Sequence, residues 1–290
     1  MAPITVALLG CGNLGSALAG GILSPADKAT VAVTRLITTV GTEDSKRRVE
    51  EQFDKHSSRL TVLLQQENLR AIQEADVVVF AVKPAKREEV FGAPGAREAL
   101  RGKLIISIMA GTSTKELSRL ALGDQPPTGD QLALQVVRAM PNMAAKIREA
   151  VTLFTADLNT LTKENYEITS WLFNQVGEGQ CIPEATFDIS AVLVGCAGSL
   201  LLLAVDGLLD AAVAEGVRRP EATKMAVNSA IGMMKLVPAG NHPSVLREKI
   251  ASPGGCSIRA LLELEKQGVR AAFTRAILAA ADRSKQMSKS

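Results

Sequence analysis

The chain has 290 residues, of which 47% are hydrophobic and 22% charged, and its formal net charge is +3. This balance is typical of a globular protein, and the length allows two domains. The small net charge gives no support to a nucleic-acid-binding surface, and an aromatic content of 3% argues against platforms for stacking bases or sugars.

The cysteines and histidines limit the metal and disulfide chemistry that we expect. Four scattered cysteines without a C-x-x-C spacing predict neither a zinc site nor a disulfide framework. His56 and His242 are the only histidines, so we expect no metal centre. The start of the chain lacks a basic region before its first apolar run, which predicts no targeting peptide and a cytoplasmic protein.

The first motif is a glycine-rich turn between a strand and a helix. An apolar run over residues 4–9 leads into Gly10, Gly12 and Gly15, which fill a G-x-G-x-x-G pattern, and a helix-like segment follows. In this context the glycines allow a tight turn, the approach of a pyrophosphate and close helix packing. The pattern predicts a dinucleotide site. Its expected contacts are Gly10, Gly12, Asn13, Leu14 and Gly15.

The second strand, expected at residues 35–40, carries the signal for cofactor preference. In NAD enzymes an acidic residue usually closes this strand and binds the ribose hydroxyls, but here Gly41 and Thr42 follow it. The basic residues Lys46, Arg47 and Arg48 come next and could hold a 2′-phosphate, which favours NADPH over NADH. The alternative is that they form a solvated helix face.

Strands and helices alternate up to about residue 183. Ser113 and Glu116 have the spacing of a helix capping box. A Pro/Gly-rich surface loop is expected at residues 124–131. Further strands are expected at residues 60–64, 77–82, 104–109, 135–140, 150–154 and 180–182, and helices at residues 67–74 and 163–175. The alternation predicts a Rossmann-type, doubly wound α/β domain over residues 1–183.

From residue 184 to 290 the pattern predicts an all-helical dimerisation and substrate domain. Residues 189–205 carry no charge and approach the length of a membrane span. Small residues at the centre and flanking Asp188 and Asp206 favour a buried helix in a helical core, so we expect no membrane partner. Because the domain is so apolar, we expect one face to pack on a second copy. Its helices are expected at residues 189–215, 220–236, 244–250 and 258–287.

Four segments in order resemble the Δ1-pyrroline-5-carboxylate reductase family. They are the glycine turn, Ala81-Val82-Lys83-Pro84, Arg138-Ala139-Met140-Pro141-Asn142, and His242-Pro243 followed by Ser252-Pro253-Gly254-Gly255-Cys256-Ser257-Ile258. The resemblance implies NAD(P)H-dependent reduction of a cyclic imine, 1-pyrroline-5-carboxylate, to proline. It also implies an interlocked homodimer whose interface completes the active site, with larger rings built from dimers. Members of the family act in the cytoplasm or in mitochondria.

Reduction of a cyclic imine needs a hydride at carbon and a proton or hydrogen bond at nitrogen. Neither histidine lies at an expected site, so a hydroxyl group or water must serve. The resemblance gives this role to Ser257, and it places the substrate carboxylate on Ser252 and on backbone N–H groups near Gly254, Gly255 and Cys256. The alternative is that this segment only caps a helix.

The resemblance also extends the cofactor site. Asn68 matches an asparagine that contacts the adenosine half, and Lys83 as a buried general acid is an alternative to its cofactor-related role. The further cofactor contacts that it implies are Asn68, Ala81, Val82, Lys83, Pro84, Ala110 and Gly111.

Departures from the family pattern fall mainly in the substrate half. Met143 replaces a small hydroxyl residue, and Cys196 lies in a segment that has lost a proline and an aromatic residue. Both are expected to line the substrate pocket. Three interpretations remain: reduction of 1-pyrroline-5-carboxylate, reduction of a related or substituted cyclic imine, and a non-catalytic oligomeric homologue. The hydroxyl at Ser257 argues against the last.

Overall fold

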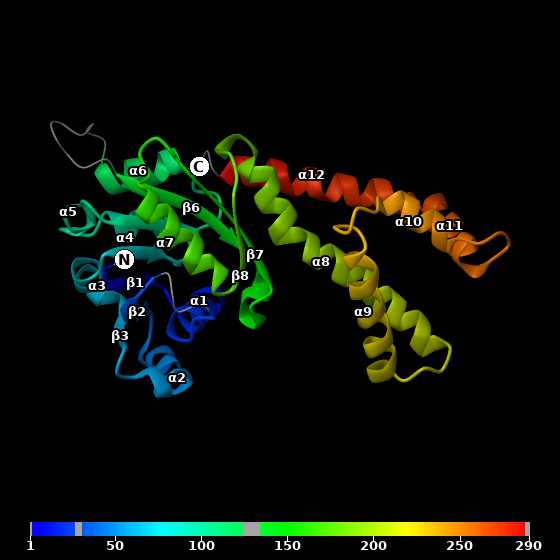
Figure 1. Cartoon of the computed structure of the whole chain (residues 1–290), viewed down its shortest axis with the longest axis horizontal. Coiled ribbons are helices and arrows are strands. Elements are labelled where there is room, and N and C mark those ends of the chain that lie inside the picture. Colours follow the sequence, from blue (N-terminus) through cyan, green and yellow to red (C-terminus); the bar gives the residue numbers. More distant parts are fainter. Residues whose placement is uncertain (1, 27–30, 124–133, 288–290) are drawn as a thin grey trace. The chain divides into compact units, whose positions relative to one another are not determined.

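The computed structural model describes residues 2–26, 31–123 and 134–287 of the chain. An eight-stranded sheet dominates the N-terminal part, with strand order β3-β2-β1-β4-β5-β6-β7-β8 (Figure 1). All neighbouring strands pair in parallel except β6 and β7, which are antiparallel. The strands are β1 (Ile4–Leu9), β2 (Val33–Val40), β3 (Leu60–Leu64), β4 (Val77–Phe80), β5 (Leu104–Ser107), β6 (Gln135–Pro141), β7 (Ala150–Ala156) and β8 (Gly177–Cys181).

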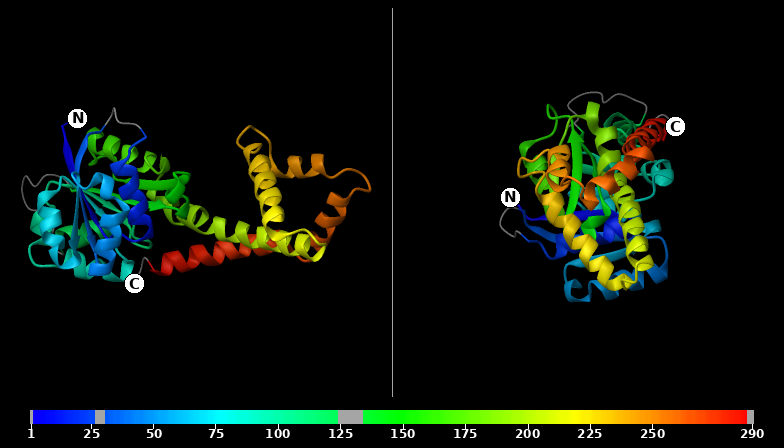
Figure 2. Two further views of the ribbon diagram at one scale, coloured as in Figure 1. Left: turned by 90° about the horizontal axis from the view of Figure 1, so that it is seen from below. Right: turned by 90° about the vertical axis from the view of Figure 1, so that its right-hand side faces the viewer.

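Helices cover both faces of this sheet, which confirms the predicted doubly wound α/β fold (Figures 1 and 2). Helices α1, α2 and α7 contribute to one hydrophobic cluster, and α3 to α6 to the other. The helices of this part are α1 (Asn13–Leu23), α2 (Glu43–Gln52), α3 (Asn68–Glu74), α4 (Arg87–Phe91), α5 (Ala96–Leu100), α6 (Thr114–Leu122) and α7 (Lys163–Asn174).

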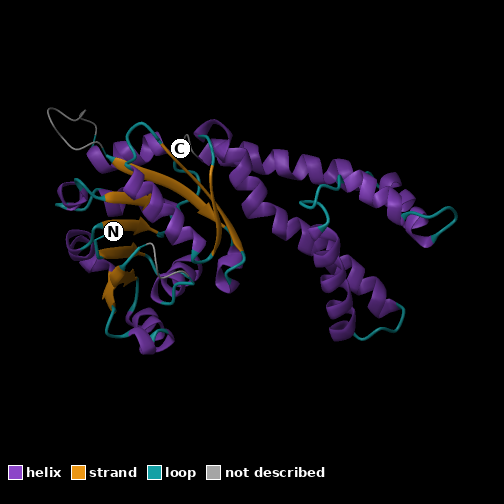
Figure 3. Cartoon of the chain, viewed as in Figure 1, coloured by secondary structure: helices purple, strands orange, loops and turns teal. Residues whose placement is uncertain are grey.

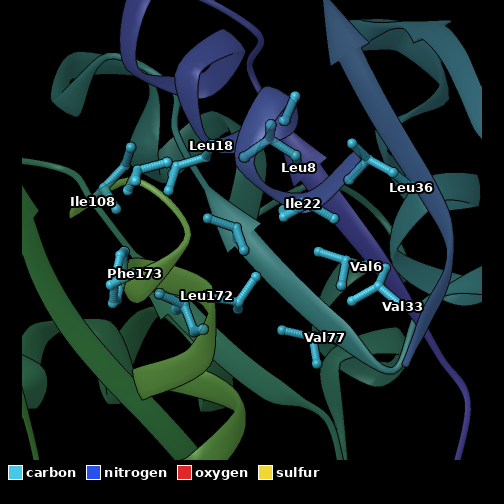
Figure 4. Close-up of a cluster of buried hydrophobic side chains, with 14 of the residues drawn as sticks. Val6, Leu8, Leu18, Ile22, Val33, Leu36, Val77, Ile108, Leu172 and Phe173 are labelled. Atoms are coloured by element: carbon cyan, nitrogen blue, oxygen red, sulfur yellow. The ribbon is translucent and has the colours of Figure 1, made fainter. Parts of the chain in front are cut away.

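The core of the sheet follows the two-residue period of its strands. In β1, Val6 and Leu8 face the cluster with α1, whereas Ala7 and Leu9 face the opposite cluster, and all four are fully buried. Figure 4 shows side chains of the first cluster, where Leu18 and Ile22 of α1 lie over β1. Burial on both faces explains why these strands read as continuous apolar runs in the sequence.

Two strands end earlier than the sequence predicts. The expected strand at 77–82 ends at Phe80, and that at 104–109 ends at Ser107, and these two residues form the last register pair of β4 and β5. Beyond Phe80 the chain turns into a short 3-10 helix that begins at Pro84, which has no N–H to continue a ladder. The loop predicted at 124–131 lies outside the described residues.

Of the two hydrogen bonds in the capping box predicted for α6, the structure contains only the one accepted by Ser113. The Ser113 hydroxyl accepts a hydrogen bond from the Glu116 N–H at 3.2 Å, as an N-cap does. The carboxylate of Glu116 instead accepts hydrogen bonds from Arg119. The ion pair with Arg119 therefore replaces the reciprocal half of a capping box.

The chain divides into two compact units, residues 1–195 with 281–290, and residues 196–280. The described chain between 196 and 280 contains helices and turns only (Figure 3). The helices from residue 184 on are α8 (Glu184–Ala214), α9 (Arg219–Lys235), α10 (Pro243–Ile250), α11 (Cys256–Lys266) and α12 (Val269–Met287). The expected single helical region at 258–287 is interrupted at Gly268, whose φ is +64°.

The first turn of α8 is fixed to the sheet by a buried arginine. Arg138 of β6 is 3% exposed, and its guanidinium donates to Glu184 Oε1 at 3.0 Å and to the Asp188 carboxylate. The same guanidinium lies 4.2 Å from the ring centroid of Phe187. A buried charge needs such partners, so Arg138 explains why α8 begins within the first unit.

The prediction that residues 189–205 form a buried helix in a helical core is wrong for the single chain. Leu202 and Leu203 of α8 are 68% and 71% exposed, and only 11% of the most apolar window of α8 is buried. By length and composition alone, α8 could cross a membrane. No element of its own unit covers this apolar surface, so the burial that its composition predicts is not provided within one chain.

Candidate active site

The glycine turn has a different geometric requirement at each glycine. Gly10 has φ of +100°, and a Cβ there would lie 2.8 Å from the Ala81 carbonyl oxygen. A Cβ on Gly15 would lie 2.2 Å from the Gly10 carbonyl oxygen. Gly12 differs, because a Cβ there would meet nothing within 4 Å. Gly10 and Gly15 are thus required by packing, whereas Gly12 borders open space that a ligand can approach.

The N-terminus of α1 faces this open space without a side-chain cap. Gly12 is the N-cap residue and offers no side-chain acceptor. Among the described residues, the backbone N–H groups of Asn13, Leu14 and Gly15 have no recorded acceptor. Free N–H groups and the positive end of a helix dipole favour an anion. The turn therefore fits the pyrophosphate of a dinucleotide.

At the end of β2, the predicted 2′-phosphate contacts are arranged differently from expectation. Thr42 caps α2, because its Oγ1 accepts from the Ser45 N–H at 3.2 Å. Arg47 is directed to Asp44, with which it forms an ion pair on an exposed surface. Lys46 is half-buried, and no partner is recorded for it among the described residues.

The other predicted cofactor residues gather at the carboxyl ends of β4 and β5, where ligands bind in such sheets. Ala81 follows β4 directly and donates its N–H to Leu9 O at 2.8 Å. Ala110 and Gly111 follow β5, and Gly111 has φ of +71°. Val82, Lys83 and Pro84 form the turn after β4. Lys83 is exposed in the single chain, which gives no support to the alternative of a buried general acid at this position.

Asn68 is the first residue of α3 and carries an unsatisfied polar atom. Its Oδ1 is buried and has no hydrogen-bond partner within the described chain. A buried carbonyl oxygen without a partner costs free energy. Such an atom is a fitting partner for a donor on a ligand, as expected of a residue that contacts the adenosine half.

The substrate loop lies in the second unit and ends at the start of α11. Gly255 is the N-cap of α11 without a side-chain cap, and Gly254 has φ of +73°. The Gly255 N–H donates to Ser252 O at 3.0 Å, and a Cβ on Gly255 would lie 2.5 Å from Ser252 Oγ. This close contact requires glycine and holds the Ser252 hydroxyl beside the helix N-terminus.

Ser257 lies in the first turn of α11 with a free hydroxyl. The residue is half-buried, and no hydrogen-bond partner is recorded for its Oγ in the part of the chain that the structure describes. Cys256 beside it is exposed. The loop thus presents two serine hydroxyls and the N–H groups of a helix start, which together can bind a carboxylate and donate to a nitrogen.

The neighbouring motif residues keep this loop in place. His242 caps α10, since its Nδ1 accepts from the Ser244 N–H at 3.3 Å. Arg247 of α10 forms an ion pair with Glu265 of α11 at 3.4 Å. The sequence analysis gave no role to His242, and its capping position explains why His-Pro opens this segment.

Met143 and Cys196, the two predicted changes of the substrate pocket, belong to different compact units. Met143 begins the 3-10 helix η4 (Met143–Ile147) after Asn142, whose Oδ1 accepts from the Ala144 N–H, and it is 53% exposed. Cys196 is half-buried in α8, and its carbonyl oxygen accepts from Ser199 Oγ at 2.7 Å. A pocket containing both side chains stays a prediction.

One basic residue near the glycine turn was missed by the sequence prediction, and a second was predicted only as part of the basic cluster after β2. A cavity of about 950 Å³ runs along α1 and is lined by Gly12, Asn13, Arg48 and Lys146, among others. Arg48 belonged to the predicted basic cluster, but Lys146 comes from η4, far away in sequence, and no local motif could have indicated it. In the described chain, no group of three or more His, Cys, Asp or Glu side chains could hold a metal ion.

Comparison with known proteins matches two families to the two parts of the chain. Residues 184–287 match pyrroline-5-carboxylate reductase dimerisation, and residues 5–111 match NADP oxidoreductase coenzyme F420-dependent. A pyrroline-5-carboxylate reductase of Lophium arboricola is 33% identical over 99% of this chain and 94% of that protein. One of Neurospora crassa is 35% identical over 94% and 90% of the two chains.

Solved structures show the same fold over the whole chain. A Plasmodium falciparum pyrroline carboxylate reductase with NADP bound has a TM-score of 0.81 at 24% identity, with 99% of both chains covered. A Coxiella burnetii pyrroline-5-carboxylate reductase has a TM-score of 0.78 at 25% identity, with 98% of both chains covered.

Proposed function

Because the chain belongs to the pyrroline-5-carboxylate reductase family, we propose that it reduces 1-pyrroline-5-carboxylate to proline with NADPH. The observation that carries the proposal is the 33% identity to a protein of that name over 99% of this chain. The free N–H groups at Gly12–Gly15 and the free hydroxyl of Ser257 support it, because the reaction needs both a cofactor site and a donor to nitrogen.

Bound NADPH supplies the hydride, and the residues of the first unit hold it. The N–H groups at the start of α1 bind its pyrophosphate, and Gly12 leaves room for this contact. Asn68 Oδ1 accepts from the adenosine half, and the backbone at Ala81 and Gly111 lines the nicotinamide half. NADH is the alternative cofactor, since Thr42 caps α2 and Arg47 is paired with Asp44.

Ser257 and the N-terminus of α11 bind and orient the imine. The N–H groups at Gly255–Ser257, with the hydroxyl of Ser252, hold the carboxylate at the positive end of the helix. The hydroxyl of Ser257 then donates to the lone pair of the ring nitrogen, which polarises the C=N bond and stabilises the negative charge that develops on nitrogen as hydride adds to the carbon. The substrate N–H that results receives its proton through this hydroxyl from water.

We propose further that the enzyme is a homodimer and that the exposed apolar face of α8 lies in its interface. Leu202 and Leu203 are exposed together with Leu193, Leu201 and Leu208 of the same helix, and contiguous exposed apolar side chains mark interaction surfaces. The matched dimerisation family covers this helix. Burial of the face between copies removes it from water, and on this basis we expect a soluble enzyme of the cytoplasm or of mitochondria.

A second candidate function is reduction of a related or substituted cyclic imine. The observation that favours it is the exposed thioether of Met143 where the family has a small hydroxyl residue. Met143 changes the volume and removes a donor, so an apolar substituent on the ring could replace the missing hydroxyl contact.

Consumption of NADPH with 1-pyrroline-5-carboxylate, followed by absorbance and by detection of proline, tests the proposal. We expect robust turnover with this substrate. Turnover with a substituted cyclic imine alone would select the second candidate. Measurable NADPH binding without turnover of any imine would show a non-catalytic homologue and would reject both.

A further inference from the structure

Basic side chains that are distant from α1 in the sequence reach both ends of the cavity along this helix. At the glycine turn, Lys146 Nζ lies 3.3 Å from Oδ1 of Asn13, the first residue of α1. At the other end, Arg148 donates to Ser24 O at 2.7 Å, and the His56 ring lies 2.9 Å from the Ser24 hydroxyl. The ends of an eleven-residue helix are about 16 Å apart, so these two groups of side chains lie at different places along the cavity.

Arg48 is the second cation at the glycine-turn end. It lines the cavity together with Gly12 and Asn13, and no hydrogen-bond or ion-pair partner is recorded for its guanidinium among the described residues. The positive charge of Arg48 affects the pKa of Cys11, a residue of the glycine turn. Burial raises the pKa of the Cys11 thiol, hydrogen bonds with Ser16 and Thr38 oppose this rise, and the charge of Arg48 adds to the opposition.

The neighbouring basic residue is held elsewhere. The guanidinium of Arg47 is paired with Asp44 on the surface of α2, and Arg47 does not line the cavity. Two carboxylates, Glu51 and Asp54, also line the cavity. Glu51 lies three residues beyond Arg48 on α2, and Asp54 follows α2 in a short 3-10 helix.

We propose that Arg48 and Lys146 form a two-sided cation clamp on the pyrophosphate of the nicotinamide dinucleotide. Arg48 comes from α2 and Lys146 from η4, and both line the cavity that includes Gly12 and Asn13 at the uncapped N-terminus of α1. The pyrophosphate is common to NADPH and NADH, so the clamp strengthens binding of both. It replaces the predicted role of Lys46 and Arg47 with a contact that does not read the 2′-phosphate.

The inference rests on the proposed function, since it requires a dinucleotide at the glycine turn. Its test is the Kd of NADPH and of NADH for the purified protein, measured by calorimetry without substrate. We expect Arg48→Ala and Lys146→Met each to raise both constants about tenfold, the scale of one charge-assisted hydrogen bond. Both side chains are exposed, so the melting temperature without nucleotide should not change.

Two matched variants distinguish direct contact with the pyrophosphate from long-range attraction by any nearby positive charge. Arg47→Ala removes the same charge one residue away, and Lys55→Ala removes a charge from the same cavity. We expect each to change both constants less than twofold. If Lys55→Ala lost as much nucleotide affinity as Arg48→Ala, long-range attraction rather than a direct clamp would explain the effect.

Three outcomes would overturn the clamp. In the first, the double variant Arg48→Ala/Lys146→Met binds both nucleotides as tightly as the wild type. In the second, only NADPH binding weakens, which would assign these residues to the 2′-phosphate. In the third, Lys146→Arg fails to retain the affinity that Lys146→Met loses. Failure of the wild-type protein to bind any dinucleotide would instead reject the proposed function.

Discussion

The two compact units differ in how much of their apolar surface a single chain covers. In the first unit, the strands are enclosed on both faces, and residues such as Val6 and Leu8 are fully buried. In the second, the leucines of α8 are largely exposed. The cofactor half therefore folds around its own core, whereas the helices of the substrate half are buried only in the proposed dimer.

The largest effect is expected from a charge on the exposed face of α8. Leu203→Asp places a carboxylate in the proposed interface, where burial of an unpaired charge is costly. Light scattering should then report a monomer, and turnover should fall to background, while NADPH binding persists in the first unit. Leu158→Asp is the matched control, because Leu158 is similarly exposed but lies in the first unit. A dimeric, active Leu203→Asp variant would remove α8 from the interface.

In the substrate half, Ser257→Ala should lower kcat about a hundredfold, the scale of a positioned proton donor. Its Kd for NADPH should stay near the wild-type value, because the cofactor contacts are in the other unit. Steady-state kinetics at several pH values measure the effect. Ser252→Ala provides the contrast, since loss of a carboxylate contact should raise KM more than it lowers kcat. Unchanged kcat in Ser257→Ala would reject the hydroxyl as the donor to nitrogen.

In the cofactor half, Gly12→Val should weaken NADPH binding on the order of tenfold or more without loss of stability. Apart from its chain neighbours, no described residue lies within 4 Å of a Cβ at this position, so the added side chain enters the open space that the ligand would occupy. Gly15→Ala should instead destabilise the fold, since its Cβ would meet Gly10 O at 2.2 Å. Melting curves and nucleotide titrations distinguish the two. A destabilised Gly12→Val variant would contradict the assignment of open space.

The smallest effect concerns a feature that serves only the fold. Ser113→Ala removes the side-chain cap of α6 and should reduce the free energy of unfolding by about 1 kcal/mol. The melting temperature should fall by a few degrees, with no change in the Kd for NADPH. A marked loss of nucleotide affinity would show that Ser113 also belongs to the cofactor site.

Local patterns in the sequence predicted the first unit well. The run from Ile4 to Leu9 and the glycines that follow it are determined by neighbours in sequence, and so are the short strand at 60–64 and the cap at Ser113. The ends of β4 and β5 were placed too late, because apolar residues continue after the last ladder pair at Phe80 and Ser107. Hydrophobic periodicity records burial and does not record where pairing ends.

Contacts between distant segments could not be predicted. Lys146 reaches Asn13 and Arg138 reaches Glu184 only through the fold. The basic run at Lys46–Arg48 predicted cations near the cofactor, but helix geometry directs Arg47 to Asp44 and leaves Arg48 at the cavity. For α8, composition predicted a burial that the single chain does not provide, because a sequence does not show whether a covering surface belongs to the same chain or to another.

The most direct test mixes two impaired variants, Gly12→Val and Ser257→Ala, and measures turnover after their subunits exchange, at an NADPH concentration well below the Kd of the Gly12→Val variant. If the dimer interface completes the active site, as the resemblance implies, the intact cofactor half of one copy works with the intact substrate half of the other. Half of randomly mixed dimers are then heterodimers with one intact site, so about a quarter of the wild-type activity should return. Exchange confirmed by mass spectrometry without any return of activity would show that each chain builds its site alone, and would contradict the account.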